Sequence, residues 1–325
     1  MQNSIRAMYV KNHVAVFVIH IRFLSFVLKR IAINGKIYIS GIQHVMPILG
    51  EDSGNKEAGT FHLICRECDS RLFQEYEDPT AYSKNPTAKM LAQVVMKNYL
   101  LMISKRFEEK ELYIILRDQF ENAYEHAENQ LKIIDLDLAE YQGEFERAKI
   151  AGVGKHDDWY YLCYYKHLDY VVPFTFQGPV VMVGDFEDNV INEIYNMSPD
   201  YHTKEIHIAV FPLEKTSVIM MLVDSREKRY RKFYRQLNKL PLEEQLAAIN
   251  YIIFSYSENV FISKTVGDDV LNNPQFLDVC QKCNVAVSSL FIKDILPTAL
   301  HEFSLSKRKE IPNLLNEFYA LNAER

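Results

Sequence analysis

The sequence predicts an α+β protein in which an N-terminal zinc-knuckle module is followed by a helical segment, an antiparallel sheet and C-terminal helices. Three patterns carry this prediction: a Cys-x-x-Cys pair at residue 65, apolar residues at helical spacing after residue 86, and short β-branched and aromatic runs between residues 160 and 223. Because 325 residues exceed the usual size of one domain, we expect two. The zinc-knuckle module would span residues 1–85, and a helix–sheet–helix domain would span residues 86–325.

The composition is that of a globular protein, and the net charge bears on its partners. Hydrophobic residues make up 48% of the chain and charged residues 25%, which is enough to form a sizeable core. The net charge is −6, whereas proteins that bind nucleic acid often have a strongly basic balance, so a nucleic-acid partner would require a local basic patch. The five cysteines form no secreted disulfide pattern, and we therefore expect a reducing cytoplasm.

The N-terminal apolar run at residues 13–28 predicts buried strands. A membrane-spanning helix needs about 20 mostly apolar residues. His20 and Arg22 interrupt this run, and no small-residue cleavage site of a signal peptide follows it, so we expect no membrane partner. The Val, Ile and Phe content favours strands that continue through residues 36–39 after a turn at Asn34-Gly35.

Residues 87–151 predict three helices. Two polar loops that contain Gly or Pro precede them, at residues 50–60 and 76–86. From Thr87 onward, apolar residues recur at i, i+3 and i+4, which indicates an amphipathic helix. A second helix is expected from about residue 108 to 132, and a third from about residue 136 to 151.

The second half of the chain predicts one antiparallel sheet and then more helices. Five short runs rich in Val, Ile, Tyr and Phe are separated by turn signals, and they fall at residues 160–165, 170–176, 180–183, 206–211 and 218–223. A basic helix is expected at residues 226–235, where Asp224 or Ser225 would cap it, and another helix from Pro241 through Tyr256.

The stretch from His44 to Cys68 is the part of the sequence that indicates chemistry. Cys65 and Cys68 form a Cys-x-x-Cys turn, in which two thiolates can bind one tetrahedral zinc ion at about 2.3 Å. Leu63-Ile64 would form the strand that enters this knuckle, and Asp69-Ser70 would lead the chain out of it. A structural zinc site is therefore expected here.

This stretch resembles the zinc-stabilised members of the HNH endonuclease family. The family places a histidine, an apolar residue and a proline ahead of a Gly-containing loop and a Leu-x-Cys-x-x-Cys motif. The matching residues are Gln43-His44-Val45-Met46-Pro47, Gly50 to Gly59, and Leu63-Ile64-Cys65-Arg66-Glu67-Cys68-Asp69. The resemblance implies that His44 is the general base that activates water, that Cys65 and Cys68 hold a structural Zn²⁺, and that a catalytic Mg²⁺ stabilises the leaving oxygen.

Three departures from the family pattern leave enzymatic activity open. No cysteine pair precedes His44, although the zinc-stabilised members usually carry one there. Gln43 stands where the family often has an acidic residue, and the expected Asn is missing just before the cysteine pair, where the chain has Thr60-Phe-His62. The resemblance is confined to residues 41–71.

Cys280 and Cys283 form a second Cys-x-x-Cys pair, which could be part of a zinc site, ordinary helix packing or a redox dithiol. They could complete a four-cysteine zinc site with Cys65 and Cys68, although more than 200 residues separate the two pairs. On a helix, they would instead be neighbours on one face that take part in ordinary packing.

The basic segment at residues 226–235 is the candidate for contact with DNA or RNA. Its six Lys and Arg residues could neutralise phosphates while Tyr230, Phe233 and Tyr234 pack inward or stack on bases. The alternative is an amphipathic helix whose aromatic residues face the sheet and whose charges face water. The acidic loop at residues 185–188 likewise fits either a cation site or a solvated turn.

Two functions from different classes follow from these patterns. The first is metal-dependent cleavage of DNA or RNA by an HNH-like site, or nucleic-acid binding by an inactive form of that site. The second is a non-enzymatic, zinc-stabilised binding protein in which the sheet and a surface rich in the chain's 20 tyrosines contact another protein.

Overall fold

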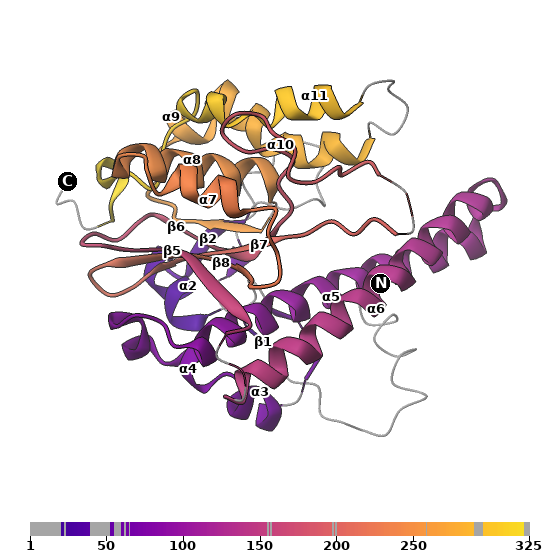
Figure 1. The fold of residues 1–325 in the computed structure, drawn as a ribbon, viewed down its shortest axis with the longest axis horizontal. Coiled ribbons are helices and arrows are strands. Elements are labelled where there is room, and N and C mark those ends of the chain that lie inside the picture. The colour runs from indigo at the N-terminus through magenta and orange to yellow at the C-terminus, as the bar shows by residue number, and fades with distance from the viewer. Residues whose placement is uncertain are drawn as a thin grey trace.

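A central antiparallel sheet lies between two layers of helices (Figure 1). The structure is a computed structural model that describes residues 21–22, 24–39, 53–54, 60–61, 63–64, 66–154, 156, 158–196, 198, 200–257, 259–288 and 295–321. The helices and the antiparallel sheet confirm the predicted α+β class. The zinc-knuckle module stays a prediction, because His44 and Cys65 lie outside the described residues.

Within the described residues, the sheet has seven strands, and every neighbouring pair is antiparallel. In spatial order they are β3 (Ser53–Gly54), β2 (Lys36–Ile39), β9 (Val260–Ile262), β6 (Phe174–Val180), β7 (Ile206–Pro212), β8 (Ser217–Asp224) and β5 (Tyr160–Leu168). Apart from this sheet, β1 (Ile21–Arg22) pairs with β4 (Thr60–Phe61). The long strand β5 is therefore at one edge.

The predicted sheet is confirmed, with one difference in its strands. Residues 170–176 and 180–183, expected as two strands, contribute instead to the single strand β6. The Gly178-Pro179 pair does not form the expected turn, because residues 176–180 all pair with β7. The turn predicted at Asn34-Gly35 is confirmed: both residues have positive φ, 52° and 76°, and β2 follows directly.

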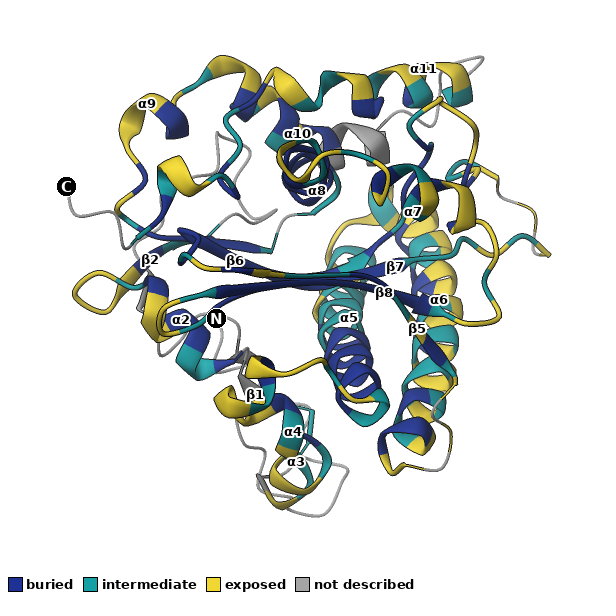
Figure 2. Ribbon diagram, turned by 60° about the vertical axis from the view of Figure 1, so that its left-hand side comes forward, coloured by how far each residue is buried: buried dark blue, intermediate teal, exposed yellow. Residues whose placement is uncertain are grey.

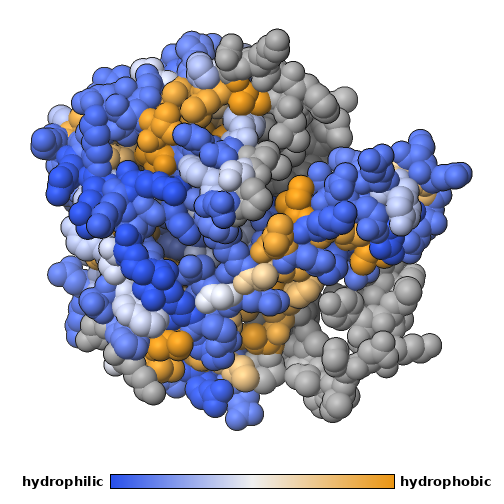
Figure 3. Space-filling view, turned by 45° about the vertical axis from the view of Figure 1, so that its right-hand side comes forward, coloured by the Kyte–Doolittle hydropathy of each residue, from blue (hydrophilic) through white to orange (hydrophobic). Residues whose placement is uncertain are grey.

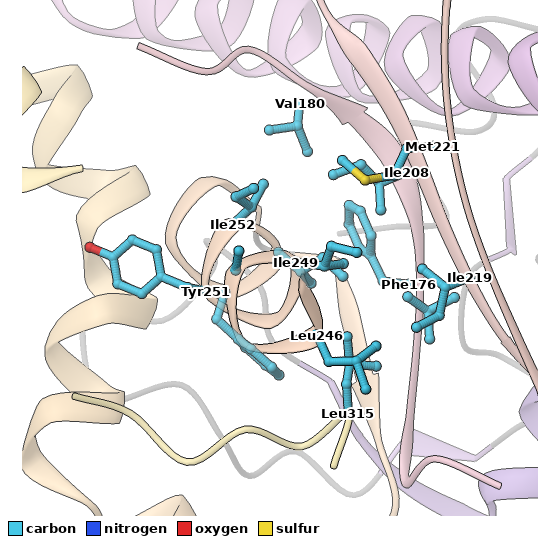
Figure 4. Packing of buried hydrophobic residues seen from close by; sticks show 14 of the residues in the cluster. Phe176, Val180, Ile208, Ile219, Met221, Leu246, Ile249, Tyr251, Ile252 and Leu315 are labelled. Carbon is cyan, nitrogen blue, oxygen red and sulfur yellow. The ribbon is translucent and has the colours of Figure 1, made fainter. Parts of the chain in front are cut away.

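The central strands are apolar on both faces because a helical layer covers each face (Figure 2). In β8, Met220 and Leu222 belong to one core cluster, and Ile219 and Met221 belong to the other. Figure 4 shows the second cluster, in which Ile249 lies against side chains of the sheet.

Two long helices, α5 (Ala88–Gln119) and α6 (Tyr124–Gly152), form a hairpin on one face of the sheet. The Thr87 hydroxyl caps α5 by accepting a hydrogen bond from the Met90 N–H at 3.0 Å. The far half of the hairpin extends beyond the sheet (Figure 1). The prediction of three helices is wrong here. Lys, Arg and Glu at residues 105–111 are strong helix formers that continue α5 across the expected gap, the chain turns at Glu121–Ala123 inside the expected second helix, and α6 continues through residues 132–136.

Shorter helices complete this layer, and their bounds are α2 (Ser25–Ile31), α3 (Arg66–Leu72), α4 (Gln74–Glu77) and a 3-10 helix at Pro79–Ser83. Residues 25–31 form a helix rather than the predicted strand, because Val27, Leu28 and Ile31 fall on one helical face and are all buried. This layer shares a core with residues of the sheet such as Phe211. The domain boundary near residue 85 stays a prediction.

The opposite face of the sheet is covered by α7 (Arg231–Leu237), α8 (Leu242–Tyr256), α9 (Asp268–Leu271), α10 (Pro274–Ser288), α11 (Ile295–Glu302), and 3-10 helices at Leu305–Lys309 and Glu317–Tyr319. The helix expected after Pro241 is confirmed as α8. The basic helix begins at residue 231 rather than 226, because the Asp224 side chain accepts a hydrogen bond from the Arg226 N–H at 2.8 Å and holds the preceding residues in a turn.

None of the helices in the described part of the chain combines the length and the apolar composition that crossing a membrane requires.

Candidate functional site

Of the three residues expected to form the HNH-like site, the structure describes Cys68. His44 and Cys65 lie outside the described residues. Cys68 is half-buried on α3, two residues after the helix begins at Arg66. The described residues contain no group of three or more His, Cys, Asp or Glu side chains placed to hold a metal ion.

The helix that carries Cys68 is fixed to α5 by a buried lysine. The Lys97 side chain is 3% exposed, and its Nζ donates to Asp69 Oδ1 at 2.7 Å. Glu77 lies 3.5 Å from the same Nζ. The ammonium group also lies 4.0 Å from the centre of the Phe73 ring, which favours a cation there. Burial raises the pKa of Glu77, and Lys97 partly offsets that shift.

A chain of buried hydrogen bonds continues from α4 into the sheet. Tyr76 donates to Gln177 Oε1 at 2.7 Å, Gln177 donates to Asn98 Oδ1 at 2.8 Å, and Asn98 Nδ2 lies 3.1 Å from His207 Nδ1. Burial lowers the pKa of His207 to about 3, so the imidazole is neutral at physiological pH. These side chains satisfy one another, and their arrangement indicates a structural role.

Cys68 and Cys280, the described members of the two cysteine pairs, lie on opposite sides of the sheet. Leu72 of α3 packs with the core cluster on the α5 face, whereas Cys280 of α10 packs with the cluster on the α8 face. Figures 1 and 2 both place α3 and α10 on opposite sides of the sheet. Burial also raises the pKa of the Cys280 thiol to about 12, which disfavours the thiolate that zinc requires. For Cys280, the packing interpretation therefore holds.

The acidic loop after β6 forms a turn. Asp185 is 2% exposed, and its Oδ1 accepts hydrogen bonds from the Glu187 and Asn189 N–H groups at 2.8 and 3.0 Å. Lys232 contributes a positive charge 3.7 Å from Asp185. These contacts compensate the charge of the Asp185 carboxylate without a metal ion.

In the basic segment at residues 226–235, some cationic side chains bind neighbouring residues and others do not. Lys232 forms an ion pair with Glu187, and Arg229 donates to the His202 carbonyl at 2.9 Å. Tyr230 and Phe233 are fully buried, as the amphipathic interpretation predicts. Three further residues are exposed, and their side chains form no ion pair or hydrogen bond within the described residues; they are Lys228, Arg231 and Arg235.

Two of these cations flank an aromatic pair at the edge of the sheet. The rings of Tyr161, on β5, and Tyr234, on α7, lie 5.6 Å apart, and Tyr161 is 50% exposed. The positive charges of Arg231 and Arg235 both act on the Tyr234 hydroxyl. A surface that combines half-exposed rings with uncompensated guanidinium groups can stack on planar ligands and attract phosphate.

Trp159, the single tryptophan of the chain, packs with the core cluster on the α5–α6 face of the sheet, whereas Tyr234 packs with the cluster on the α7–α8 face. Its ring lies between the Arg147 guanidinium, 3.9 Å away, and the exposed His156 ring, 4.1 Å away and nearly parallel. Burial alone would raise the pKa of Asp224, but hydrogen bonds from Arg226 and Arg147 hold it below its ordinary value. The Asp224 charge is thus compensated within this region.

We name the basic and aromatic region on β5 and α7 the β5 edge surface and define it as Tyr161, Arg231, Tyr234 and Arg235. The sequence predicted the basic segment but assigned residues 160–165 to a strand without a binding role. Buried strands also carry aromatic residues at alternate positions. The sequence therefore contained no sign that Tyr161 would be exposed. The position of β5 at the sheet edge is what leaves Tyr161 exposed.

Comparisons with known proteins give no family: no protein-family model matches the chain, and neither the curated proteins nor the solved structures include a match.

Proposed function

We propose that this protein binds single-stranded nucleic acid through the β5 edge surface. The observation that carries the proposal is the pairing of Tyr161 with Tyr234 beside Arg231 and Arg235, two exposed guanidinium groups that have no acidic partner in the described structure. Single-stranded nucleic acid suits such a surface because its bases are free to stack on aromatic rings while its phosphates meet the cations.

Base stacking and counterion release would supply the free energy of binding. Stacking of one base on an aromatic side chain contributes about 1–3 kcal/mol, and each phosphate that is neutralised releases bound counterions. The whole chain carries a net charge of −6, so the attraction would be local and would weaken steeply with added salt. Asp158 is exposed next to Trp159 and opposes the attraction by one charge.

Binding can be tested by the fluorescence anisotropy of a labelled oligothymidylate at low salt. We expect the double variant Arg231→Ala/Arg235→Ala to bind at least tenfold more weakly, with a shallower salt dependence. Tyr161→Ala should weaken binding about fivefold or more. The matched control is Lys29→Ala/Lys132→Ala, which removes two exposed cations elsewhere. Equal affinity of all variants, or no binding by the wild type, would refute the proposal.

For catalysis, we propose HNH-like phosphodiester cleavage with His44 as the general base, Cys65 and Cys68 as ligands of a structural Zn²⁺, and Mg²⁺ as the catalytic ion. This step is supported by the resemblance of residues 41–71 alone. Incubation with single-stranded DNA or RNA and Mg²⁺ or Mn²⁺ tests it, because His44→Ala should abolish cleavage. Equal cleavage by both proteins, or none by either, contradicts it and leaves a binding protein.

A further inference from the structure

In the far half of the α5–α6 hairpin, the two helices are joined by one row of ion pairs, which we call the seam. We call this part, residues 105–140, the distal arm. Three ion pairs join its helices: Arg106–Asp137 at 2.9 Å, Lys110–Asp135 at 2.5 Å and Arg117–Glu128 at 3.0 Å. Because the α5 members of these pairs recur every four to seven residues, they lie on one side of that helix. The other sides of α5 are left without a helix of the described structure against them, since the arm extends beyond the sheet (Figure 1).

An apolar ridge runs along the distal arm outside this seam. Leu112, Leu116 and Phe120 follow one another at intervals of four residues on α5, and Tyr124 continues the series across the turn into α6. Leu112 is 54% exposed, Phe120 51% and Tyr124 55%. Figure 3 shows apolar side chains at the surface of the projecting hairpin. Several large apolar groups this close together on one exposed element are typical of an interaction surface.

The charge around the ridge is strongly acidic. Residues 108–128 contain seven acidic side chains and two basic ones, Lys110 and Arg117, and both basic side chains are already engaged in the seam. Glu111, Glu121 and Glu125 form no ion pair in the part of the chain that the structure describes. These carboxylates are close in sequence to Leu112, Phe120 and Tyr124. Charge complementarity therefore favours a partner that is both apolar and basic.

We propose that the distal arm docks a basic amphipathic helical segment of another protein. Its apolar face would cover Leu112, Leu116 and Phe120, and its Lys and Arg residues would pair with Glu111, Glu121 and Glu125. A second copy of this chain fits less well, because two acidic arms would repel each other. The same negative charge repels phosphates, so this surface is separate from the nucleic-acid contact proposed on β5.

The test is a binding titration of the full chain with two designed helical peptides, one of Leu and Lys and one of Leu and Glu with the same Leu positions. We expect the Leu/Lys peptide to bind at least tenfold more tightly. The double variant Leu112→Asp/Phe120→Asp, which changes two exposed positions, should lower that affinity at least tenfold. The charge variant Glu121→Lys/Glu125→Lys, which preserves the ridge, should lower it at least threefold. The control Phe318→Asp, at a 75% exposed position outside the arm, should leave it unchanged.

Three outcomes would overturn the proposal. These are the absence of binding by either peptide, equal binding of the two peptides, and an unchanged affinity in both arm variants. Sedimentation velocity of the same proteins shows whether a second copy of the chain, rather than another protein, covers the ridge. A dimer of the wild type that Leu112→Asp/Phe120→Asp dissociates would assign the ridge to a second copy of the chain instead.

Discussion

Lys97 is the residue on which the attachment of the Cys68 helix depends. It is almost fully buried, yet it lies between Asp69 and Glu77 and beneath the Phe73 ring. A buried cation is tolerated only when its charge is paired, and the removal of one partner leaves the other charges uncompensated. Because Asp69 itself is 18% exposed, water can relieve part of that cost.

We predict that Lys97→Met destabilises the protein by about 2–4 kcal/mol in urea unfolding, since it leaves two carboxylates without their cation. The matched control is Lys89→Met, because Lys89 pairs with Glu75 in a partly exposed position where such a pair contributes less. A loss below about 1 kcal/mol for Lys97→Met would contradict the buried ion pair.

His207 should make stability depend on pH. Its pKa is lowered to about 3 in the fold from an ordinary value near 6.5 because burial disfavours the charged ring. Between these pH values the unfolded chain binds a proton that the folded chain does not, so stability is complete above pH 6.5 and decreases as the pH falls toward 3.

We predict that the wild type loses about 1 kcal/mol more than His207→Gln when the pH falls from 7 to 5.5, measured by urea unfolding at both values. The other titrating groups contribute equally to the pH dependence of both proteins, so their contributions cancel in the comparison. An identical loss in both proteins would show that His207 titrates equally in the folded and unfolded chains.

At the scale of elements, the cap of α5 holds the start of the helix that supports the sheet. Thr87 accepts from the Met90 N–H and donates to Glu75 Oε2 at 2.5 Å, so it also joins α5 to α4. We predict that Thr87→Ala costs about 1 kcal/mol of unfolding free energy, while Thr87→Ser, which keeps the hydroxyl, costs less than half of that. Thermal unfolding of the three proteins checks this, and equal values for Ala and Ser would refute the capping role.

The elements show how far the sequence determined the fold. Helical spacing identified the start of α5 at Thr87, and β-branched runs identified β5, β7 and β8, because their side-chain periods are local properties. The helical state of residues 25–31 was missed because a short apolar segment fits a buried helix as well as a strand. The continuation of α5 through residues 103–107 was missed because the apolar spacing lapses there, although Lys and Arg are strong helix formers. The β5 edge surface depended on which strand is outermost, which is a property of the whole sheet.

At the scale of the whole molecule, the sheet separates Cys68 from Cys280, and this gives a test of zinc binding. We predict that Cys280→Ser/Cys283→Ser retains the zinc content of the wild type, whereas Cys65→Ser loses it, because Cys68 and Cys280 lie on opposite faces. Elemental analysis of the purified proteins measures this. Loss of zinc from the Cys280→Ser/Cys283→Ser protein would contradict the arrangement of the two helical layers.

Different parts of the molecule would contact different partners. The β5 edge surface is basic and aromatic and would contact nucleic acid, whereas the distal arm is acidic and apolar and would contact protein. The two regions have opposite charge, so added salt should weaken both contacts, but charge variants of one should leave the other unaffected. The central claim remains the nucleic-acid contact on β5.

Trp159 permits a direct measurement of that claim, because it is the single tryptophan and lies two residues before Tyr161 in the sequence. Titration of the wild type with oligothymidylate should quench or shift the Trp159 emission in a saturable manner, since an oligonucleotide bound at Tyr161 would lie close to the ring. Arg231→Ala/Arg235→Ala should require at least tenfold more oligonucleotide for the same change. Equal oligonucleotide affinity of the wild type and the Arg231→Ala/Arg235→Ala protein would place nucleic acid elsewhere and contradict the contact on β5.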